Sequence, residues 1–427
     1  MSEQFVIEGA HALAGTVLPS GNKNAALPIL AACLLTDEEV VLENVPDILD
    51  VHALLALLDD VGVSVREEGP NALALRAERV RTTSLDEDLC RRIRASVLLA
   101  GPLLAREGRV DLPLPGGDFI GRRRVDTHML AFRALGADVD VERSYRMSHR
   151  GLHGADIFLD EASVTGTENA LMAAVLAPGE TVLTNAACEP HVQDLARFLV
   201  ALGADIDGIG TNVLRVHGVD RLRGGRFRVG PDHIEIASFI GLAAVTGSDI
   251  EIVDVRPEDL PMILIAFGRL GIRVELNGST LRVPPDQDLH IVADEGDAIP
   301  KIDDGPWPAF PADLTSIALA LATQADGTIL IFEKMFENRL FFVDKLVAMG
   351  ARIILCDPHR AVVSGPARLY GERLESPDIR AGMAMLIASL AAHGTSRIGN
   401  VGQIDRGYER IDERLRALGA RIERVRA

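Results

Sequence analysis

The hydrophobic positions of this chain form two different helical patterns that alternate along its length. In the first, almost every residue is apolar or small, as in segments 25–35 (AALPILAACLL), 168–177 (ENALMAAVLA), 236–245 (IASFIGLAAV), 314–322 (LTSIALALA) and 381–392 (AGMAMLIASLAA). A helix that is apolar on every side is buried, and none of these runs reaches the roughly 20 residues that a bilayer span requires. We therefore predict helices packed inside a globular core.

The second pattern is an amphipathic helix that ends at a glycine and precedes a short strand. In residues 194–206 (DLARFLVALGADI), apolar residues recur at helical spacing before the glycine. Glycine suits a helix end because it adopts the left-handed conformation without steric cost. The ending occurs six times, at intervals of 67 to 79 residues, with glycines at Gly62, Gly136, Gly203, Gly271, Gly350 and Gly419. A nearly fixed period indicates repeated copies of one α/β unit.

Six copies in 427 residues favour two domains of three copies each, because a single core rarely grows to this size. The boundary is expected near Pro231, after the third copy. The strand-like segment 4–10 (QFVIEGA) precedes the first copy and is predicted to complete the sheet of the last copy. We therefore predict one domain from residues 22–230 and a second from residues 1–21 together with 231–427.

Composition narrows the possible partners. The chain has 44 Lys and Arg against 62 Asp and Glu, a formal net charge of −18, which argues against nucleic acid as a partner. Its four cysteines lack the spacing of a metal site or a disulfide framework. The first residues lack the basic and apolar segments of a signal peptide. We expect a cytoplasmic protein that has no membrane partner, and no prediction of oligomeric state follows.

Lys23 is the first candidate for chemistry, since it lies in a polar loop at the start of a buried run. A helix N-terminus presents free N–H groups and the positive end of a dipole, which suits an anion. The alternative is a solvated lysine outside the core. The other buried runs begin at or near Arg94, Thr165, Asp232, Asp313 and Arg380. If pseudo-symmetry gathers these helix starts, the chain forms a cleft for a small, negatively charged substrate.

The segment 113–128 (PLPGGDFIGRRRVDTH) is the second candidate. Glycines on both sides of Asp118 indicate a mobile loop. Residues 122–124 are three consecutive arginines, and arginine binds phosphate with a bidentate fork. The alternative is a surface loop whose arginines pair with acidic neighbours.

Asp313 and several charged segments are further candidates. Prolines in segment 306–314 (PWPAFPADL) lead Asp313 to a helix start, where an N-cap is the simpler role. The segments 336–339 (FENR), 378–381 (DIRA) and 404–411 (IDRGYERI) place charges beside apolar runs. Structural salt bridges are the alternative explanation for these charges.

Several long motifs, in this order, resemble the enolpyruvyl transferases: SGNKNAALPIL (20–30), RIRASVLLAGPLLA (92–105), LPGGDFIGRRRVDTH (114–128), FENR (336–339) and DRGYERI (405–411). The resemblance covers essentially the whole chain. It implies an α/β fold of two inside-out barrels, each built from three βαβαββ units, with the active site in the interdomain cleft. FENR and DRGYERI fit the sugar-nucleotide branch of the family better than the shikimate-3-phosphate branch.

The implied reaction moves the enolpyruvyl group of phosphoenolpyruvate to the 3′-hydroxyl of UDP-N-acetylglucosamine and releases phosphate. This is the first committed step of peptidoglycan synthesis, and it implies no metal and no cofactor. Two alternatives stay open: another uridine nucleotide as acceptor in a secondary pathway, and a paralogue that binds the nucleotide without turnover.

The resemblance also implies residue roles. Asp313 would accept the proton of the hydroxyl group, Asp118 would protonate the enol carbon, and Lys23 would act in catalysis while holding phosphoenolpyruvate. The other implied substrate-binding residues are Asn24, Arg94, Arg123, Arg124, Val125, Asp126, Thr127, Ser163, Val164, Met335, Arg339, Arg380 and Arg406.

The chain also departs from the family pattern. Asp118 stands where cysteine is usual, so the resemblance implies resistance to fosfomycin, an epoxide that forms a thioether with that cysteine. The other departures are Arg124, Glu161, Cys188, His233 and Trp307. Several of them fall on the nucleotide side, so the donor is better defined than the acceptor.

Overall fold

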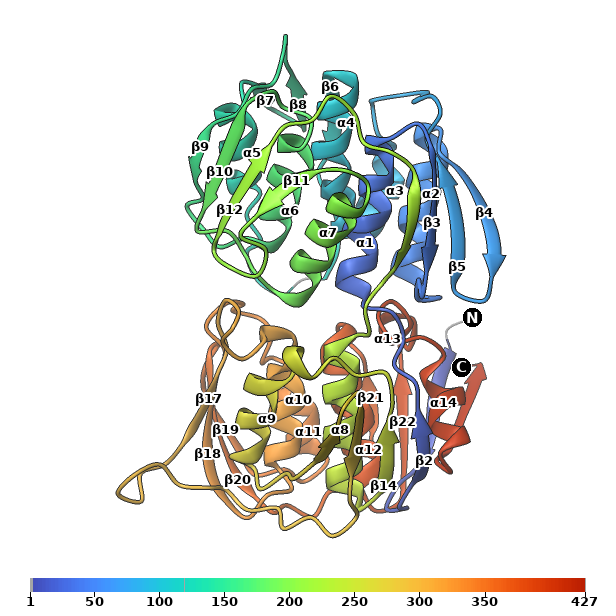
Figure 1. Cartoon of the computed structure of the whole chain (residues 1–427). Coiled ribbons are helices and arrows are strands. Elements are labelled where there is room, and N and C mark those ends of the chain that lie inside the picture. Colours follow the sequence, from blue (N-terminus) through green and yellow to red (C-terminus); the bar gives the residue numbers. More distant parts are fainter. Residues whose placement is uncertain (1–2, 119, 427) are drawn as a thin grey trace. The chain divides into compact units, whose positions relative to one another are not determined.

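The computed structural model describes residues 3–118 and 120–426, which form two compact units (Figure 1). The amino-terminal unit comprises residues 21–118 and 123–230, and the carboxy-terminal unit comprises residues 3–20, 120–122 and 231–426. The predicted division into 22–230 and 1–21 with 231–427 differs at Gly21, which groups with the amino-terminal unit, and at residues 120–122. These group with the carboxy-terminal unit because Asn338 N–H donates to Ile120 O at 3.0 Å and Arg122 N–H donates to Glu337 Oε2 at 3.1 Å.

Three sheets form the amino-terminal unit. The first has the order β13 (Gly225–Arg228), β3 (Glu39–Glu43), β5 (Ala72–Arg76), β4 (Ser64–Gly69). The second has the order β6 (Arg109–Pro113), β8 (Ser144–Ser148), β7 (Asp138–Val141). The third has the order β11 (Asp205–Asp207), β12 (Val213–His217), β10 (Glu180–Thr184), β9 (Asp156–Phe158).

The helices of this unit follow the two patterns seen in the sequence. The apolar ones are α1 (Lys23–Ala32) with η1 (Cys33–Leu35), η2 (Arg94–Leu99) with α4 (Ala100–Glu107), and α6 (Val164–Ala174). The others are α2 (Leu49–Val61), α3 (Glu87–Arg92), α5 (Asp126–Ala134) and α7 (Pro190–Ala201). Helix α2 ends at Gly62, whose φ of 110° requires a residue without a Cβ.

Three sheets also form the carboxy-terminal unit. The first has the order β15 (Glu275–Asn277), β16 (Thr280–Val283), β14 (Asp249–Ile252), β2 (Ala14–Val17). The second has the order β17 (Lys301–Asp303), β18 (Gly327–Phe332), β20 (Arg360–Gly365), β19 (Ile353–Asp357). The third has the order β21 (Arg373–Glu375), β22 (Thr395–Gly399), β1 (Glu3–Glu8), β23 (Arg421–Arg426).

The apolar helices of this unit are α8 (His233–Thr246), α10 (Thr315–Ala322) after η4 (Ala312–Leu314), and α12 (Ile379–Ala391). They contact one another and belong to one hydrophobic core. The remaining helices are η3 (Pro257–Asp259), α9 (Pro261–Gly268), α11 (Val343–Ala348), α13 (Gly402–Asp405) and α14 (Ile411–Ala417). Among the described residues, no helix has the length and hydrophobicity to cross a bilayer.

All six sheets share one topology. In β9–α6–β10–α7–β11–β12, the first two strands are parallel and the last two add in antiparallel orientation. In the sheet of β6 the first strand is reduced to a single parallel bridge between Ser84 and Asp111. Strand β1 pairs with both β22 and β23, which confirms that the first strand completes the last repeat. The predicted inside-out α/β repeats are therefore present, three to each unit.

Candidate active site

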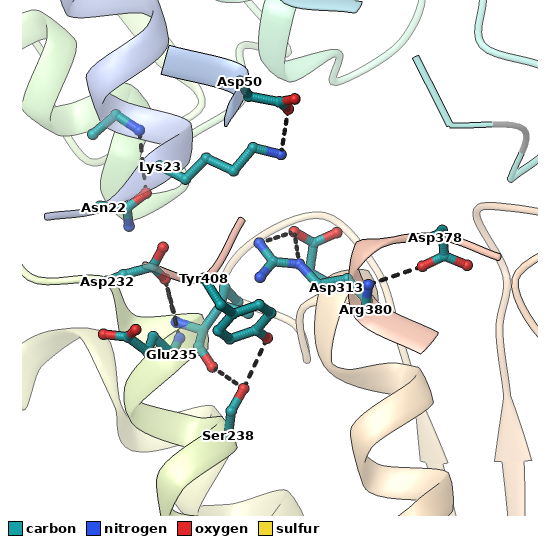
Figure 2. A network of polar contacts seen from close by, with 12 residues as sticks. Asn22, Lys23, Asp50, Asp232, Glu235, Ser238, Asp313, Asp378, Arg380 and Tyr408 are labelled. Carbon is teal, nitrogen blue, oxygen red and sulfur yellow. Dashed lines mark hydrogen bonds and ion pairs between the residues drawn. The ribbon is translucent and has the colours of Figure 1, made fainter. Parts of the chain in front are cut away.

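Lys23 begins α1, and its position differs from the solvated loop that the sequence also allowed. The side chain of Asn22 caps the helix by accepting from Ala25 N–H at 3.1 Å. The ammonium group of Lys23 lies 2.9 Å from Asp50 Oδ2 in the first turn of α2, as Figure 2 shows. Both residues are buried, and the neighbouring Asn24 is half-buried. The charge of Lys23 is thus balanced inside the amino-terminal unit.

The loop that precedes Asp118 packs tightly against the end of α3 and the start of η2. Gly116 N–H donates to Cys90 O at 3.0 Å. A Cβ on Gly116 would lie 1.8 Å from Arg91 O, and one on Gly117 would lie 2.7 Å from the Cβ of Arg94. The two glycines are therefore required by close approach of two backbones. Asp118 follows them and is half-buried.

Arg94 connects this loop to the arginine segment. Its guanidinium donates to the carbonyl oxygens of Arg123 at 2.6 Å and Arg124 at 3.3 Å. Burial lowers the pKa of Arg94 from its ordinary value. The predicted anion ligands Arg94 and Arg123 are thus neighbours, and Arg94 fixes the backbone of Arg123.

Arg124 is an exposed residue in an ion-pair network. It donates to Asp126 Oδ2 at 2.9 Å and to Asp160 Oδ2 at 2.8 Å. Thr127 O–H donates to Asp160 Oδ1 at 2.7 Å, and this hydrogen bond, reinforced by Arg124, lowers the pKa of Asp160. The alternative of a surface arginine paired with acidic neighbours therefore describes Arg124 well.

Behind this network lies His128, which the sequence reading missed. It is completely buried, and burial lowers its pKa to about 3, so the ring is neutral. Asn169 accepts from Gly101 N–H at 2.7 Å through its oxygen, so its amide nitrogen donates to His128 Nδ1 at 2.9 Å. His128 Nε2–H is then left to donate to Thr165 Oγ1 at 3.0 Å. This network joins α5, which begins after the buried Val125, to α6.

Helix α6 begins at the predicted nucleotide-side residues. Ser163 caps it by accepting from Gly166 N–H at 3.2 Å. Val164 is half-buried and Glu161 is exposed. Burial, reinforced by the charge of Glu189, raises the pKa of the half-buried Cys188. Ser163 therefore has the capping role that its residue type favours.

In the carboxy-terminal unit, Asp313 lies between two buried arginines; this trio is called the arginine–aspartate cluster below. Arg380 donates to Asp313 Oδ2 from Nε at 3.1 Å and from a terminal nitrogen at 2.8 Å. Arg339 donates to Asp313 Oδ1 at 3.2 Å. The arginine side chains are 2% and 5% exposed, whereas that of Asp313 is 29% exposed. The accessible member of the cluster is therefore the proposed base, oriented through both of its oxygens.

Arg380 is held by Tyr408 and Asp378, which lie in the charged segments 404–411 and 378–381. Its guanidinium lies 5.4 Å from the centre of the Tyr408 ring, and burial is offset by Asp313 so that its pKa is raised. Ser238 O–H donates to Ile234 O at 2.7 Å, so Tyr408 O–H donates to Ser238 Oγ at 3.0 Å (Figure 2). Asp378 caps α12 by accepting the N–H of Arg380 at 2.9 Å.

The remaining candidates of this unit lie in other surroundings. Arg406 is half-buried and donates to Gln403 Oε1 at 2.8 Å. His233 and Trp307, both departures from the family pattern, have ring centres 6.0 Å apart in edge-to-face contact. Burial, reinforced by Arg380, lowers the pKa of His233 to about 4. The two departures thus form one neutral aromatic pair.

Met335 belongs to the loop that delivers Arg339. The N–H groups of Met335 and Phe336 donate to Glu333 Oε1 at 3.1 Å and 3.0 Å. Glu333 is fully buried and was missed because an acid directly after a strand resembles an ordinary turn residue. Within residues 3–118 and 120–426, no group of three or more His, Cys, Asp and Glu side chains is arranged to hold a metal ion.

Comparison with known proteins relates this chain to one family. The sequence model of EPSP synthase (3-phosphoshikimate 1-carboxyvinyltransferase) matches residues 7–415. A protein of Bradyrhizobium diazoefficiens named UDP-N-acetylglucosamine 1-carboxyvinyltransferase is 59% identical over 422 residues, 99% of this chain and 98% of that protein. A protein of the same name from Treponema denticola is 54% identical over 420 residues, 98% of this chain and 99% of that protein.

A solved structure gives the same relationship at the level of the fold. The enolpyruvyl transferase NikO from Streptomyces tendae superposes with a TM-score of 0.88 at 25% sequence identity. The superposition covers 100% of this chain and 99% of NikO.

Proposed function

The chain belongs to the EPSP synthase family of enolpyruvyl transferases, and we propose that it transfers the enolpyruvyl group of phosphoenolpyruvate to the 3′-hydroxyl of UDP-N-acetylglucosamine. The proposal rests on relatives that are named for this activity and that are 59% and 54% identical to this chain over nearly its full length. The reaction is the first committed step of peptidoglycan synthesis, and we assign it to the cytoplasm.

The reaction joins an oxygen to a carbon and releases inorganic phosphate. The 3′-oxygen of the sugar adds to C2 of phosphoenolpyruvate and loses its proton, while C3 gains a proton and becomes a methyl group. Loss of phosphate from C2 and of a proton from C3 then gives the enol ether. Catalysis therefore needs a proton acceptor, a proton donor and cations for the anionic groups.

We assign a residue of this chain to each of these roles. Asp313 accepts the hydroxyl proton, because its carboxylate is accessible and is oriented by Arg339 and Arg380. Arg380 also supports the carboxylate of phosphoenolpyruvate. Asp118 delivers the proton to C3 from the loop that Gly116 and Gly117 hold against η2.

The cationic residues bind the donor. Lys23, Arg94, Arg123 and Arg406 hold phosphoenolpyruvate or its phosphate in this proposal. Guanidinium groups suit this role because they bind oxyanions bidentately.

Acceptor binding is assigned to the residues that the family resemblance places on the nucleotide side. The nucleotide-side assignments are Asn24, Arg124, Val125, Asp126, Thr127, Ser163, Val164, Met335 and Arg339. Arg124 acts by joining Asp126, the first residue of α5, to Asp160 before α6. A second candidate acceptor is another uridine nucleotide. The observation that favours testing it is the aromatic pair of His233 and Trp307, two residues that depart from the family pattern.

The test is phosphate release from phosphoenolpyruvate with UDP-N-acetylglucosamine, a second uridine nucleotide or shikimate 3-phosphate as acceptor. We expect turnover with UDP-N-acetylglucosamine at a kcat/KM well above that of the other two. Turnover only with another uridine nucleotide would show that this nucleotide, and not UDP-N-acetylglucosamine, is the acceptor. Nucleotide binding without phosphate release under any condition would identify a non-catalytic paralogue and end the proposal.

Asp313→Asn tests the proposed base directly. Positioned acid–base groups contribute about 10²–10⁴-fold, so we expect kcat to fall by about a hundredfold or more while calorimetry still detects nucleotide binding. Asp344→Asn makes the same change at an exposed residue paired with Lys345 and should leave kcat unchanged. A loss of less than about tenfold in Asp313→Asn would remove the base role.

A further inference from the structure

Two buried carboxyl groups lie behind the arginine–aspartate cluster, at the ends of adjacent strands. Strands β17 and β18 are parallel, with Asp303 opposite Phe332, so the next residues, Asp304 and Glu333, also come together. Both are 0% exposed. We call Asp304 and Glu333 the carboxyl pair. One oxygen of each has a backbone donor, since Lys334 N–H donates to Asp304 Oδ1 and two N–H groups donate to Glu333 Oε1.

The other oxygen of each carboxyl group lacks a donor. Asp304 Oδ2 and Glu333 Oε2 are buried and accept no hydrogen bond from any residue of the described chain. Arg339 Nε lies 3.5 Å from Glu333 Oε2, near enough for Coulomb attraction but without hydrogen-bond geometry. The two side chains interact with each other directly. One shared proton satisfies two buried carboxyl groups that interact directly and each have an oxygen without a donor, as in carboxyl dyads elsewhere.

The charges of the neighbouring side chains also favour one proton on the carboxyl pair. The carboxyl pair and Asp313 could carry three negative charges, against the two guanidinium groups of Arg339 and Arg380. One proton on the pair restores balance, which matters because an uncompensated buried charge is costly. Burial, and then the charge of Asp304, raise the pKa of Glu333 to about 8 despite Arg339, so the proton stays in place at neutral pH.

We propose that Glu333 is a positioning residue for Asp313: as the protonated member of the carboxyl pair, it holds the loop 335–339 and leaves the charge of Arg339 to Asp313. The inference rests on the proposed function only in giving Asp313 a catalytic role. Glu333 touches no reacting atom in this proposal and acts through Arg339.

Loss of the proton would redirect Arg339. An ionised Glu333 would attract the guanidinium, which already lies 3.5 Å from its Oε2, and weaken the 3.2 Å hydrogen bond to Asp313 Oδ1. The charged or titratable groups that face Glu333 are Asp304, Arg339 and His359, whose Nδ1–H donates to Glu333 O at 2.7 Å. This hydrogen bond of His359 reaches the backbone carbonyl of Glu333, so the charges that act on the Glu333 carboxyl group are those of Asp304 and Arg339.

Two amide substitutions separate this role from a merely structural one. In Glu333→Gln the amide imitates the neutral acid and can donate to Asp304 Oδ2. In Asp304→Asn the amide can donate to Glu333 Oε2 and removes the neighbouring negative charge, so Glu333 ionises and competes for Arg339. Each variant replaces one carboxyl group by an amide. Even so, Glu333→Gln should preserve the hydrogen bond from Arg339 to Asp313, whereas Asp304→Asn should weaken it.

The experiment measures kcat and KM against pH for the wild type, both variants, the double variant and Asp303→Asn. The control changes the adjacent aspartate, which pairs with Lys301 and Lys334 at the surface. Wild-type kcat should fall above about pH 8, and Glu333→Gln should lose this alkaline fall. Asp304→Asn should lower kcat at neutral pH by about tenfold or more, because misplacing a catalytic group by about 1 Å can cost 10²-fold. The double variant should recover much of that loss.

The outcomes distinguish this inference from the proposed function. Absence of wild-type turnover with every acceptor would contradict the proposed function, and infrared difference spectra would still test the inference. The wild type minus Glu333→Gln spectrum should contain the band of a protonated carboxylic acid at neutral pH. An alkaline fall that persists in Glu333→Gln, a double variant no better than Asp304→Asn, or absence of that band would overturn the inference.

Discussion

The ammonium group of Lys23 lies 2.9 Å from the carboxylate of Asp50, and the two side chains are only 11% and 6% exposed. Lys23 is the first residue of α1, and Asp50 lies in the first turn of α2, where a negative charge is favoured by the helix dipole. The pair therefore contributes to folding as well as to the proposed site. A phosphate group that binds Lys23 must share its charge with Asp50.

Lys23→Ala should consequently reduce both turnover and stability. Breaking a buried ion pair by removing one partner costs about 3–5 kcal/mol, because a buried charge is left without its counterion. The double variant Lys23→Ala/Asp50→Asn removes that charge, so we expect it to regain much of the unfolding free energy but no turnover. Urea unfolding and phosphate release measured on the same samples check both parts. Recovery of turnover in the double variant would show that Lys23 has no direct role.

Gly117→Ala should impair the reaction through the loop that carries Asp118. The new Cβ would lie 2.7 Å from the Cβ of Arg94, at a φ of +105° that disfavours any side chain. Because misplacing a catalytic group by about 1 Å can cost 10²-fold, we expect kcat/KM to fall by about tenfold or more. Gly268→Ala is the matched control, since a Cβ there has nothing within 4 Å. Equal kinetics for the two variants would contradict a positioning role for Gly117.

The repeated architecture was predictable because its sequence pattern occurs six times in the chain. Each copy combines an all-apolar helix with an amphipathic one, and both patterns can be recognised without knowledge of tertiary contacts. The strand-like segment 4–10 was predicted to complete the last repeat because it precedes the first copy. The structure places it between β22 and β23.

The polar networks were harder to predict from the sequence, because the residues that interact in them are distant in sequence or meet only through strand register. The burial of Lys23 depends on Asp50, which lies on the next helix. Asp304 and Glu333 meet only because β17 and β18 pair in parallel with a particular register. Arg94 was expected to bind an anion, and its contacts with the carbonyl groups of Arg123 and Arg124 carry no sequence signal.

The carboxyl pair also predicts how stability depends on pH. Glu333 has a pKa of about 8 in the folded chain against an ordinary value of 4.5. The folded state therefore holds the proton more tightly, and this stabilisation is complete below about pH 4.5 and is lost as the pH rises through about 8. Glu333→Gln does not titrate, so its unfolding free energy relative to the wild type should rise across this window, by at most about 1.4 kcal/mol per pH unit. A difference independent of pH would contradict the assignment.

The last prediction concerns Asp118 and the epoxide fosfomycin. A carboxylate is a far weaker nucleophile toward an epoxide than a thiolate, and the thiolate is the reactive form of cysteine. The native cysteines offer little thiolate, because burial raises the pKa of Cys90 to about 11 and also raises those of Cys33 and Cys188. We therefore expect turnover to resist fosfomycin, with no adduct detected by intact mass spectrometry. Cys356→Ser removes the exposed thiol and controls for background alkylation.

Asp118→Cys should restore time-dependent inactivation in the Cys356→Ser background, with one adduct on the peptide that contains residue 118. The variant should retain measurable turnover, because a thiol and a carboxylic acid can both donate a proton to carbon, and its pH–rate profile should shift because the two donors titrate differently. Phosphoenolpyruvate and nucleotide together should alter the inactivation rate if residue 118 lies beside them. An active Asp118→Cys enzyme that stays insensitive would place residue 118 away from the reacting atoms. Inactivation of the wild type with an adduct on Asp118 itself would instead keep the loop in the site and overturn the chemistry argued for its carboxylate.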